Sequence, residues 1–215
     1  MLDTPKPKTR SFIGINLNPG ITPFNLIGFY LMNFWLFVML GAVLGFMAII
    51  LEDPDYYNID KTQLGKQLGN ISMICEAVVI AEELVMGVIV DTFGRKIPLL
   101  TGWLVAGIGF ALVPMFKSLY PSFLIVRMLI YCGLIVGANI PLLPDYIQKE
   151  SMGLATSIGQ TVATAAYLFS GSGLYTISEH VELAYIYYGI ATVSVLIFLI
   201  LCCSIKDLEE NKKVI

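Results

Sequence analysis

The most regular feature of the chain is a series of long apolar stretches separated by short polar segments. A helix that crosses a lipid bilayer needs about 20 mostly apolar residues. Six stretches have about this length, and they cover residues 24–51, 67–90, 98–116, 121–143, 154–177 and 183–205. The pattern predicts an all-α integral membrane protein, with six transmembrane helices in one bundle. A polar N-terminal tail, residues 1–23, and a charged C-terminal tail, residues 206–215, flank this domain.

The composition supports a membrane protein and excludes several other classes. Charged residues make up 13% of the chain, against about 25% in a soluble domain. The lipid bilayer is therefore the first partner that we expect. The longest polar segment inside the membrane domain, EDPDYYNIDKTQ, is too short for a soluble domain. No basic patch indicates a nucleic-acid partner.

The distribution of cations predicts the orientation. With six spans, both termini lie on one side, which holds nine of the 13 Lys and Arg residues, whereas the other side holds three. The excess indicates the cytosolic side, or the matrix side of a mitochondrial inner membrane. The nine are Lys6, Lys8, Arg10, Arg95, Lys96, Lys149, Lys206, Lys212 and Lys213, and the three are Lys61, Lys66 and Lys117.

Small residues recur within the spans. Gly41 and Gly45 form one small-xxx-small pair, and Gly133 and Gly137 form another. Such residues allow helix backbones to approach closely in lipid. The stretch 154–177 is small on nearly all sides, so we expect it to be the most enclosed helix of the bundle.

No set of residues indicates enzymatic chemistry. The sequence has no nucleophile–base set, phosphate-binding loop or cluster of metal ligands, so we expect neither a catalytic activity nor a cofactor or metal. Cys75, Cys132, Cys202 and Cys203 all lie in apolar surroundings and suit packing. Cys202 and Cys203 also lie where the last span leaves the membrane, which makes them candidates for acylation.

The segment between the second and third spans carries the most specific pattern. It reads GVIVDTFGRK and includes Gly87, Asp91, Gly94, Arg95 and Lys96. The pattern resembles the G-x-x-x-D-x-x-G-[RK]-[RK] motif of the major facilitator superfamily, in the loop where that family carries it. Asp91 ends a helix, where the helix dipole disfavours an anion, so it needs a partner. Gly94 permits the tight reversal that follows.

Two further segments resemble the same family. Arg127, with Gly133 and Gly137 after it, is similar to the family's pattern in helix four, and residues 144–155, PDYIQKESMGLA, are similar to its acidic stretch before helix five. The resemblance covers residues 24–205 and implies one six-helix half of a transporter. Met152 stands where the family usually has Arg, and the Gly-Pro pattern of the family's antiporters is missing. We expect Arg95 to contact Asp91 or Asp145.

Charged residues inside spans are costly in lipid and mark functional sites or internal pairs. Glu76, Glu82 and Glu83 lie in the second span and Arg127 lies in the fourth. Glu82 and Glu83 point in directions about 100° apart on one helix, so one can pack inward while the other faces lipid or a neighbour. Glu76 and Arg127 lie at similar depth, which predicts an ion pair between them. The alternative is a proton or substrate site at these charges.

Three hypotheses for the function remain. The family's transporters contain two six-helix halves, and this chain supplies one. The spans of helices one and four carry few polar side chains: Asn25, Asn33, Arg127 and Asn139. This favours an accessory subunit held by other membrane subunits, for example in a respiratory-chain complex of the mitochondrial inner membrane. The alternatives are a small-solute transporter made of two copies, and half of a longer transporter. Met1 and the charged end DLEENKKVI argue against a fragment.

Overall fold

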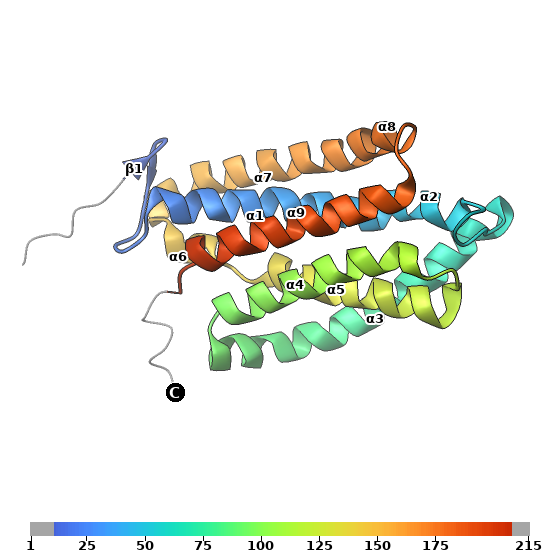
Figure 1. Ribbon diagram of the computed structural model, residues 1–215. Coiled ribbons are helices and arrows are strands. Elements are labelled where there is room, and N and C mark those ends of the chain that lie inside the picture. Colours follow the sequence, from blue (N-terminus) through green and yellow to red (C-terminus); the bar gives the residue numbers. More distant parts are fainter. Residues whose placement is uncertain (1–10, 208–215) are drawn as a thin grey trace, which may run out of the picture.

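Six long helical stretches lie side by side in the computed structural model, which describes residues 11–207 (Figure 1). Each lies within six residues of a predicted span at either end. The first is α1 (Pro23–Gly41), the π-helical turn η1 (Ala42–Phe46) and α2 (Met47–Glu52). The others are α3 (Lys61–Phe93), α4 (Lys96–Leu112) with η2 (Val113–Met115), η3 (Leu119–Phe123) with α5 (Leu124–Asn139), α7 (Met152–Leu168) with η5 (Phe169–Gly173) and α8 (Leu174–Ser178), and α9 (Leu183–Ser204).

Four of these stretches are long and apolar enough to cross a membrane, among the residues searched: Pro23–Glu52, Lys96–Met115, Leu119–Tyr146 and Leu183–Ser204. The other two are α3, which carries three glutamates, and α7, which is rich in Ser, Thr and Gly. The chain is therefore all-α with at least four apolar helices of spanning length, and the count of six spans stays a prediction.

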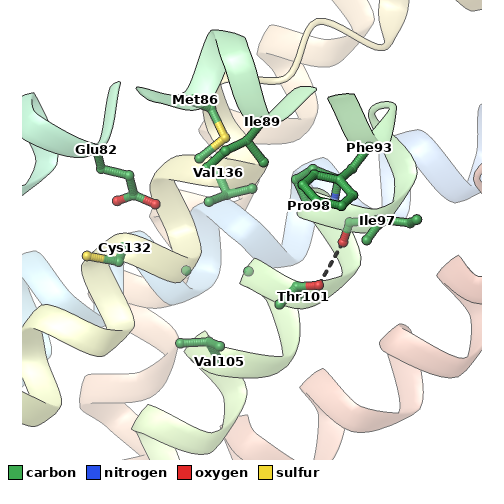
Figure 2. A pocket seen from close by; sticks show the side chains of 12 residues that line it. Glu82, Met86, Ile89, Phe93, Ile97, Pro98, Thr101, Val105, Cys132 and Val136 are labelled. Atoms are coloured by element: carbon green, nitrogen blue, oxygen red, sulfur yellow. Dashed lines mark hydrogen bonds between the residues drawn. The ribbon is translucent and has the colours of Figure 1, made fainter. Parts of the chain in front are cut away.

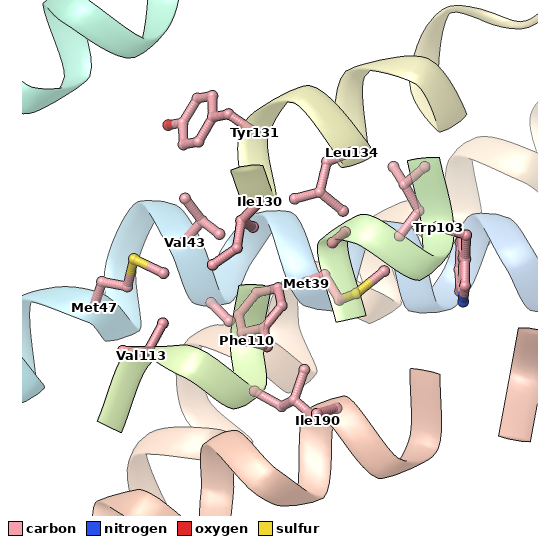
Figure 3. Packing of buried hydrophobic residues seen from close by; sticks show 14 of the residues in the cluster. Met39, Val43, Met47, Trp103, Phe110, Val113, Ile130, Tyr131, Leu134 and Ile190 are labelled. Carbon is pink, nitrogen blue, oxygen red and sulfur yellow. The ribbon is translucent and has the colours of Figure 1, made fainter. Parts of the chain in front are cut away.

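The core lies where α1, α4, α5 and α9 meet. Figure 3 shows Met39 and Val43 of the first stretch packing toward Phe110 of α4 and Ile130 of α5. One polar contact also crosses this region: the indole of Trp103 donates to the Ser194 carbonyl at 2.9 Å. The core is thus formed by four helices, and α3 and α7 are added at its edges.

Glycines allow α4 and α5 to approach closely. A methyl group on Gly102 would lie 2.8 Å from the Gly133 carbonyl, and one on Gly133 would clash with the Gly102 carbonyl. A methyl group on Gly137 would lie 2.7 Å from Leu36, whereas Gly45 faces open space. The packing role predicted for these glycines is confirmed for Gly41, Gly133 and Gly137 and is wrong for Gly45.

The α3 and α7 helices lie at opposite edges of the bundle, at the bottom and the top of Figure 1. On α7 only Ala155, Ala163 and Ala166 are buried, so the expectation that this helix is the most enclosed is wrong. Its small residues pack against α1 on one side, where Asn33 donates to the Gly159 carbonyl at 3.0 Å. The remaining sides of α7 are open. Small residues indicate that another helix packs closely, but they do not indicate how many helices do so.

The N-terminal segment folds back on the bundle's own loops. The strands β1 (Ser11–Phe12) and β2 (Ile15–Asn16) form a hairpin. Asn18 then donates to the Asp145 carbonyl at 2.9 Å, near the short helices α6 (Leu143–Tyr146) and η4 (Lys149–Ser151). At the other end of the described chain, Lys206 donates to the Gly20 carbonyl at 3.1 Å. Residues 11 and 207 therefore lie at the same end of the bundle (Figure 1).

Candidate functional site

The turn between α3 and α4 is built by three residues of the predicted motif. Gly94 caps α3, its amide donating to the Val90 carbonyl at 2.9 Å, and it has φ +77° and ψ −178°. Lys96 binds the end of α9 through its ammonium group, which donates to the Cys202 carbonyl at 2.7 Å. Its amide donates to the Asp207 carboxylate at 3.0 Å. The turn therefore fastens α3 and α4 to the C-terminal end of α9.

Arg95 forms the ion pair that the motif predicted. Its guanidinium lies 2.6 Å from the Asp145 carboxylate and 2.5 Å from the Pro141 carbonyl. The expectation that Arg95 contacts Asp91 or Asp145 is confirmed, with Asp145 as the partner. The pair joins the α3–α4 turn to the corner after α5, and its side chains are 22% and 17% exposed.

We predict that Gly94→Ala destabilises the chain by about 1–3 kcal/mol, because its backbone conformation is essentially restricted to glycine. An added methyl group would also lie 2.8 Å from the Asp207 carboxylate. Thermal unfolding in nanodiscs measures the change. Gly87→Ala is the matched control, because Gly87 lies inside α3 and faces open space. Its substitution should raise stability by about 0.5–1 kcal/mol, and a Gly94→Ala protein as stable as the Gly87→Ala protein would contradict the prediction.

A groove runs along the face that α1, α3, α5 and α7 share. One hollow, of about 470 Å³, lies between α3 and the end of α5, and it is lined by Glu83, Asp91 and Asn139. A second, of about 330 Å³, lies between α1, α5 and α7, and Asn33 and Gln160 line it. The two hollows share Ile140 and Pro141. The two adjoining hollows together are called the groove below.

The charges at the groove are acidic. The Asn139 amide donates to the Glu83 carboxylate at 2.8 Å. Asp91 is exposed, and among residues 11–207 it takes no hydrogen bond or ion pair. The partner that the sequence analysis expected for Asp91, whose charge the dipole of α3 disfavours, is therefore absent from the described part of the chain.

Glu82 and Glu83 face different surfaces, as their angular separation predicted. Glu83 lines the groove, whereas Glu82 lines a separate cavity between α3, α4 and α5. One oxygen of the Glu82 carboxylate is buried and has no hydrogen-bond partner. The two acids thus lie on different faces of α3, about 100° apart.

The predicted pair between Arg127 and Glu76 is wrong. Arg127 is 2% exposed, donates to the Ser72 hydroxyl at 3.0 Å and lies 5.5 Å from the centre of the Tyr131 ring. Its Nε and one terminal nitrogen are buried with no partner. The buried side of α3 runs through Ile71, Cys75 and Val79, and Glu76 is about 100° around the helix from Cys75. The depth of Glu76 was estimated correctly, but it lies on the exposed side of the helix.

Outside the bundle, Asp60 starts α3. The Thr62 amide and hydroxyl both donate to its carboxylate at 2.8 Å, and they lower the pKa of Asp60 below its ordinary value. The ionised carboxylate therefore caps the helix that carries the acidic residues of the groove. Among the described residues, no group of His, Cys, Asp or Glu is arranged to hold a metal ion.

A comparison of the sequence with protein families supports the family resemblance of the α3–α4 turn. The model of the Major Facilitator Superfamily matches residues 24–215. The chain belongs to the major facilitator superfamily. A search of curated proteins found no match to the chain. This protein is thus a multi-pass, transporter-like membrane protein of that superfamily.

Sequence reasoning missed part of the groove of this major facilitator protein. Thr156 and Gln160 of α7 line it, although the small-residue pattern of this helix indicated packing alone. Their spacing of four residues places both on one helix face. A search for polar residues at helical spacing within the small-residue stretch would have found them.

Proposed function

We propose that the chain acts as one six-helix half of a small-solute transporter, and that the groove faces a second half. The single observation that carries this proposal is the groove with its acidic end. Asp91 has no partner within residues 11–207, and α3 and α7 present open sides on either side of the groove. A second half supplies the missing wall in this family's architecture, either as a second copy of the chain or as further sequence.

The groove also favours a class of solute. Its charged residues are Glu83 and Asp91, and its remaining polar residues are amides and a hydroxyl. Carboxylates attract cations and repel anions at short range. We therefore propose a cationic or uncharged polar solute, and we do not expect a carboxylate or phosphate ester.

Uptake into liposomes tests this function. The purified chain, and a tandem of two copies joined by a flexible linker, are assayed with an organic cation, a neutral sugar and an organic anion. Glu83→Gln should lower cation uptake by about 10–100-fold, because a hydrogen bond to a charged group contributes about 1.5–3 kcal/mol. Glu76→Gln is the matched control, since Glu76 is exposed on the same helix and does not line the groove. Equal losses from both substitutions would contradict a role for the groove.

The second candidate is a non-catalytic accessory subunit in a larger membrane assembly, such as a respiratory-chain complex of the mitochondrial inner membrane. One observation favours it: the amides of Asn25, Asn33 and Asn139 are engaged within the chain and leave few free donors for a solute. This candidate predicts no uptake of any solute by either preparation. It also predicts that the chain remains bound to partner subunits when it is purified from its native membrane in mild detergent.

A further inference from the structure

We propose that the cavity between α3, α4 and α5 binds an elongated apolar amine, with the Glu82 carboxylate as its counter-charge. The cavity is separate from the groove, and the proposal does not require transport. It has a volume of about 370 Å³, within the range of roughly 300–1,000 Å³ that small-molecule pockets occupy. Figure 2 shows Glu82 at one end, with Met86 and Ile89 along the wall and Phe93 at the other end.

The shape of the cavity suits an elongated ligand. Along α3 it extends from Glu82 to Phe93, eleven residues, or about 16 Å at 1.5 Å per residue. Phe93 and Ile97 at the α3–α4 turn are 59% and 58% exposed, so the cavity opens there. Val105 and Val136 continue the apolar wall toward Glu82. A ligand therefore places its apolar body along α3 and its polar end beside Glu82.

The charge of the cavity selects the polar end of that ligand. Oε2 of Glu82 is buried and has no hydrogen-bond partner, and no ion pair within residues 11–207 reaches this carboxylate. The hydroxyl of Thr101 is already donated to the Ile97 carbonyl at 2.9 Å. The remaining polar side chain beside Glu82 is the Cys132 thiol, a weak donor. A carboxylate in apolar surroundings either takes up a proton or requires a compensating charge.

A protonated amine satisfies this requirement with one group, because it brings a positive charge and several N–H donors. An anion would be repelled, and a neutral alkyl chain would leave the carboxylate oxygen unpaired. Two sources share this chemistry: a free lipophilic amine, and the ammonium head group of a membrane lipid. Met86 lines both this cavity and the groove, so an amine bound at Glu82 contacts the helix whose other face carries Glu83.

Protection of Cys132 from alkylation tests the proposal. Cys75, Cys202 and Cys203 are replaced by Ala in the full chain, which is placed in phosphatidylcholine nanodiscs and treated with N-ethylmaleimide. The probe is dodecylamine, and dodecanol and dodecanoate are its neutral and anionic counterparts. At ten times its dissociation constant, dodecylamine should slow the alkylation of Cys132 about 11-fold. Dodecanol and dodecanoate should slow it less than twofold.

Two variants make the result specific. Glu82→Gln should abolish the protection by dodecylamine, whereas Glu83→Gln, which changes the adjacent acid on a different face of α3, should retain it. Val105→Phe fills the cavity and leaves Glu82 in place, so it should also abolish the protection. This variant tests the proposal independently if Glu82→Gln fails to fold. Equal protection by dodecanol, protection that persists in Glu82→Gln, or no protection by dodecylamine overturns the proposal. Alkylation of Cys132 that is slower in nanodiscs containing phosphatidylethanolamine than in phosphatidylcholine nanodiscs, and that Glu82→Gln restores to the faster rate, supports the proposal. It assigns the amine to a lipid head group.

Discussion

Replacing Arg127 with Met should raise the stability of the chain by about 2 kcal/mol, although it removes a buried and hydrogen-bonded side chain. Arg127 makes one hydrogen bond, to Ser72, and one contact with the Tyr131 ring. Two other nitrogens of Arg127 are buried and have no partner. Each unsatisfied buried group costs about 1–3 kcal/mol of stability. Met has a similar reach and no charge, so it fills the space without these penalties. For a chain of this size the gain corresponds to an increase in melting temperature of about 4–8 °C.

Thermal unfolding in nanodiscs measures this change, and Ser72→Ala is its control. Loss of the Ser72 hydroxyl leaves Arg127 with a further unpaired donor, so the melting temperature of that variant should fall. A lower melting temperature for Arg127→Met would mean that Arg127 stabilises the bundle, and the prediction would be wrong.

The same variant helps to separate the two candidate functions. A destabilising cation in the bundle is expected where the charge serves a function, since functional residues commonly reduce stability. If the chain transports a solute, Arg127→Met should be more stable and should lose uptake. If it is an accessory subunit, the variant should be more stable and should still join its assembly.

The positions of the helices could be predicted because lipid imposes a simple constraint on sequence. Every backbone polar group in the bilayer must be paired, so apolar runs of sufficient length become helices. The turn after α3 was also predictable, because Gly94 permits a local reversal and because the resemblance to the family placed Arg95 near Asp145, 50 residues further along the chain. The stretches of α3 and α7 were predicted as spans in the same way, but their glutamates and small polar residues keep them outside the four helices that are long and apolar enough to cross a membrane among the residues searched.

The partners of individual residues could not be predicted in the same way. The sequence gives the depth of Glu76 and of Arg127, but which sides of α3 and α5 face each other depends on the packing of the whole bundle. The small residues of α7 raised a similar difficulty, because they indicate a close neighbour without identifying it. Thr156 and Gln160 were missed for this reason, since the hollow that they line is formed with α1 and α5, far away in the sequence.

Arg95→Ala should destabilise the chain by about 2–3 kcal/mol, which is less than the roughly 3–5 kcal/mol lost when one partner of a fully buried pair is removed. The Arg95–Asp145 pair is mostly buried, at 22% and 17% side-chain exposure. Removal of the guanidinium breaks its ion pair with the Asp145 carboxylate and its hydrogen bond to the Pro141 carbonyl. The melting temperature in nanodiscs should fall by about 4–12 °C.

The matched control for this prediction is Lys61→Ala, which breaks the other ion pair within the described residues. Lys61 and Glu52 are 2.5 Å apart, but their side chains are 81% and 38% exposed. Water and salt screen such a pair, so its loss should change the melting temperature far less. Raising the salt concentration should weaken the Lys61 pair and leave the Arg95 pair nearly unaffected. Equal shifts for Arg95→Ala and Lys61→Ala would mean that the motif's arginine does not hold the α3–α4 turn to the corner after α5.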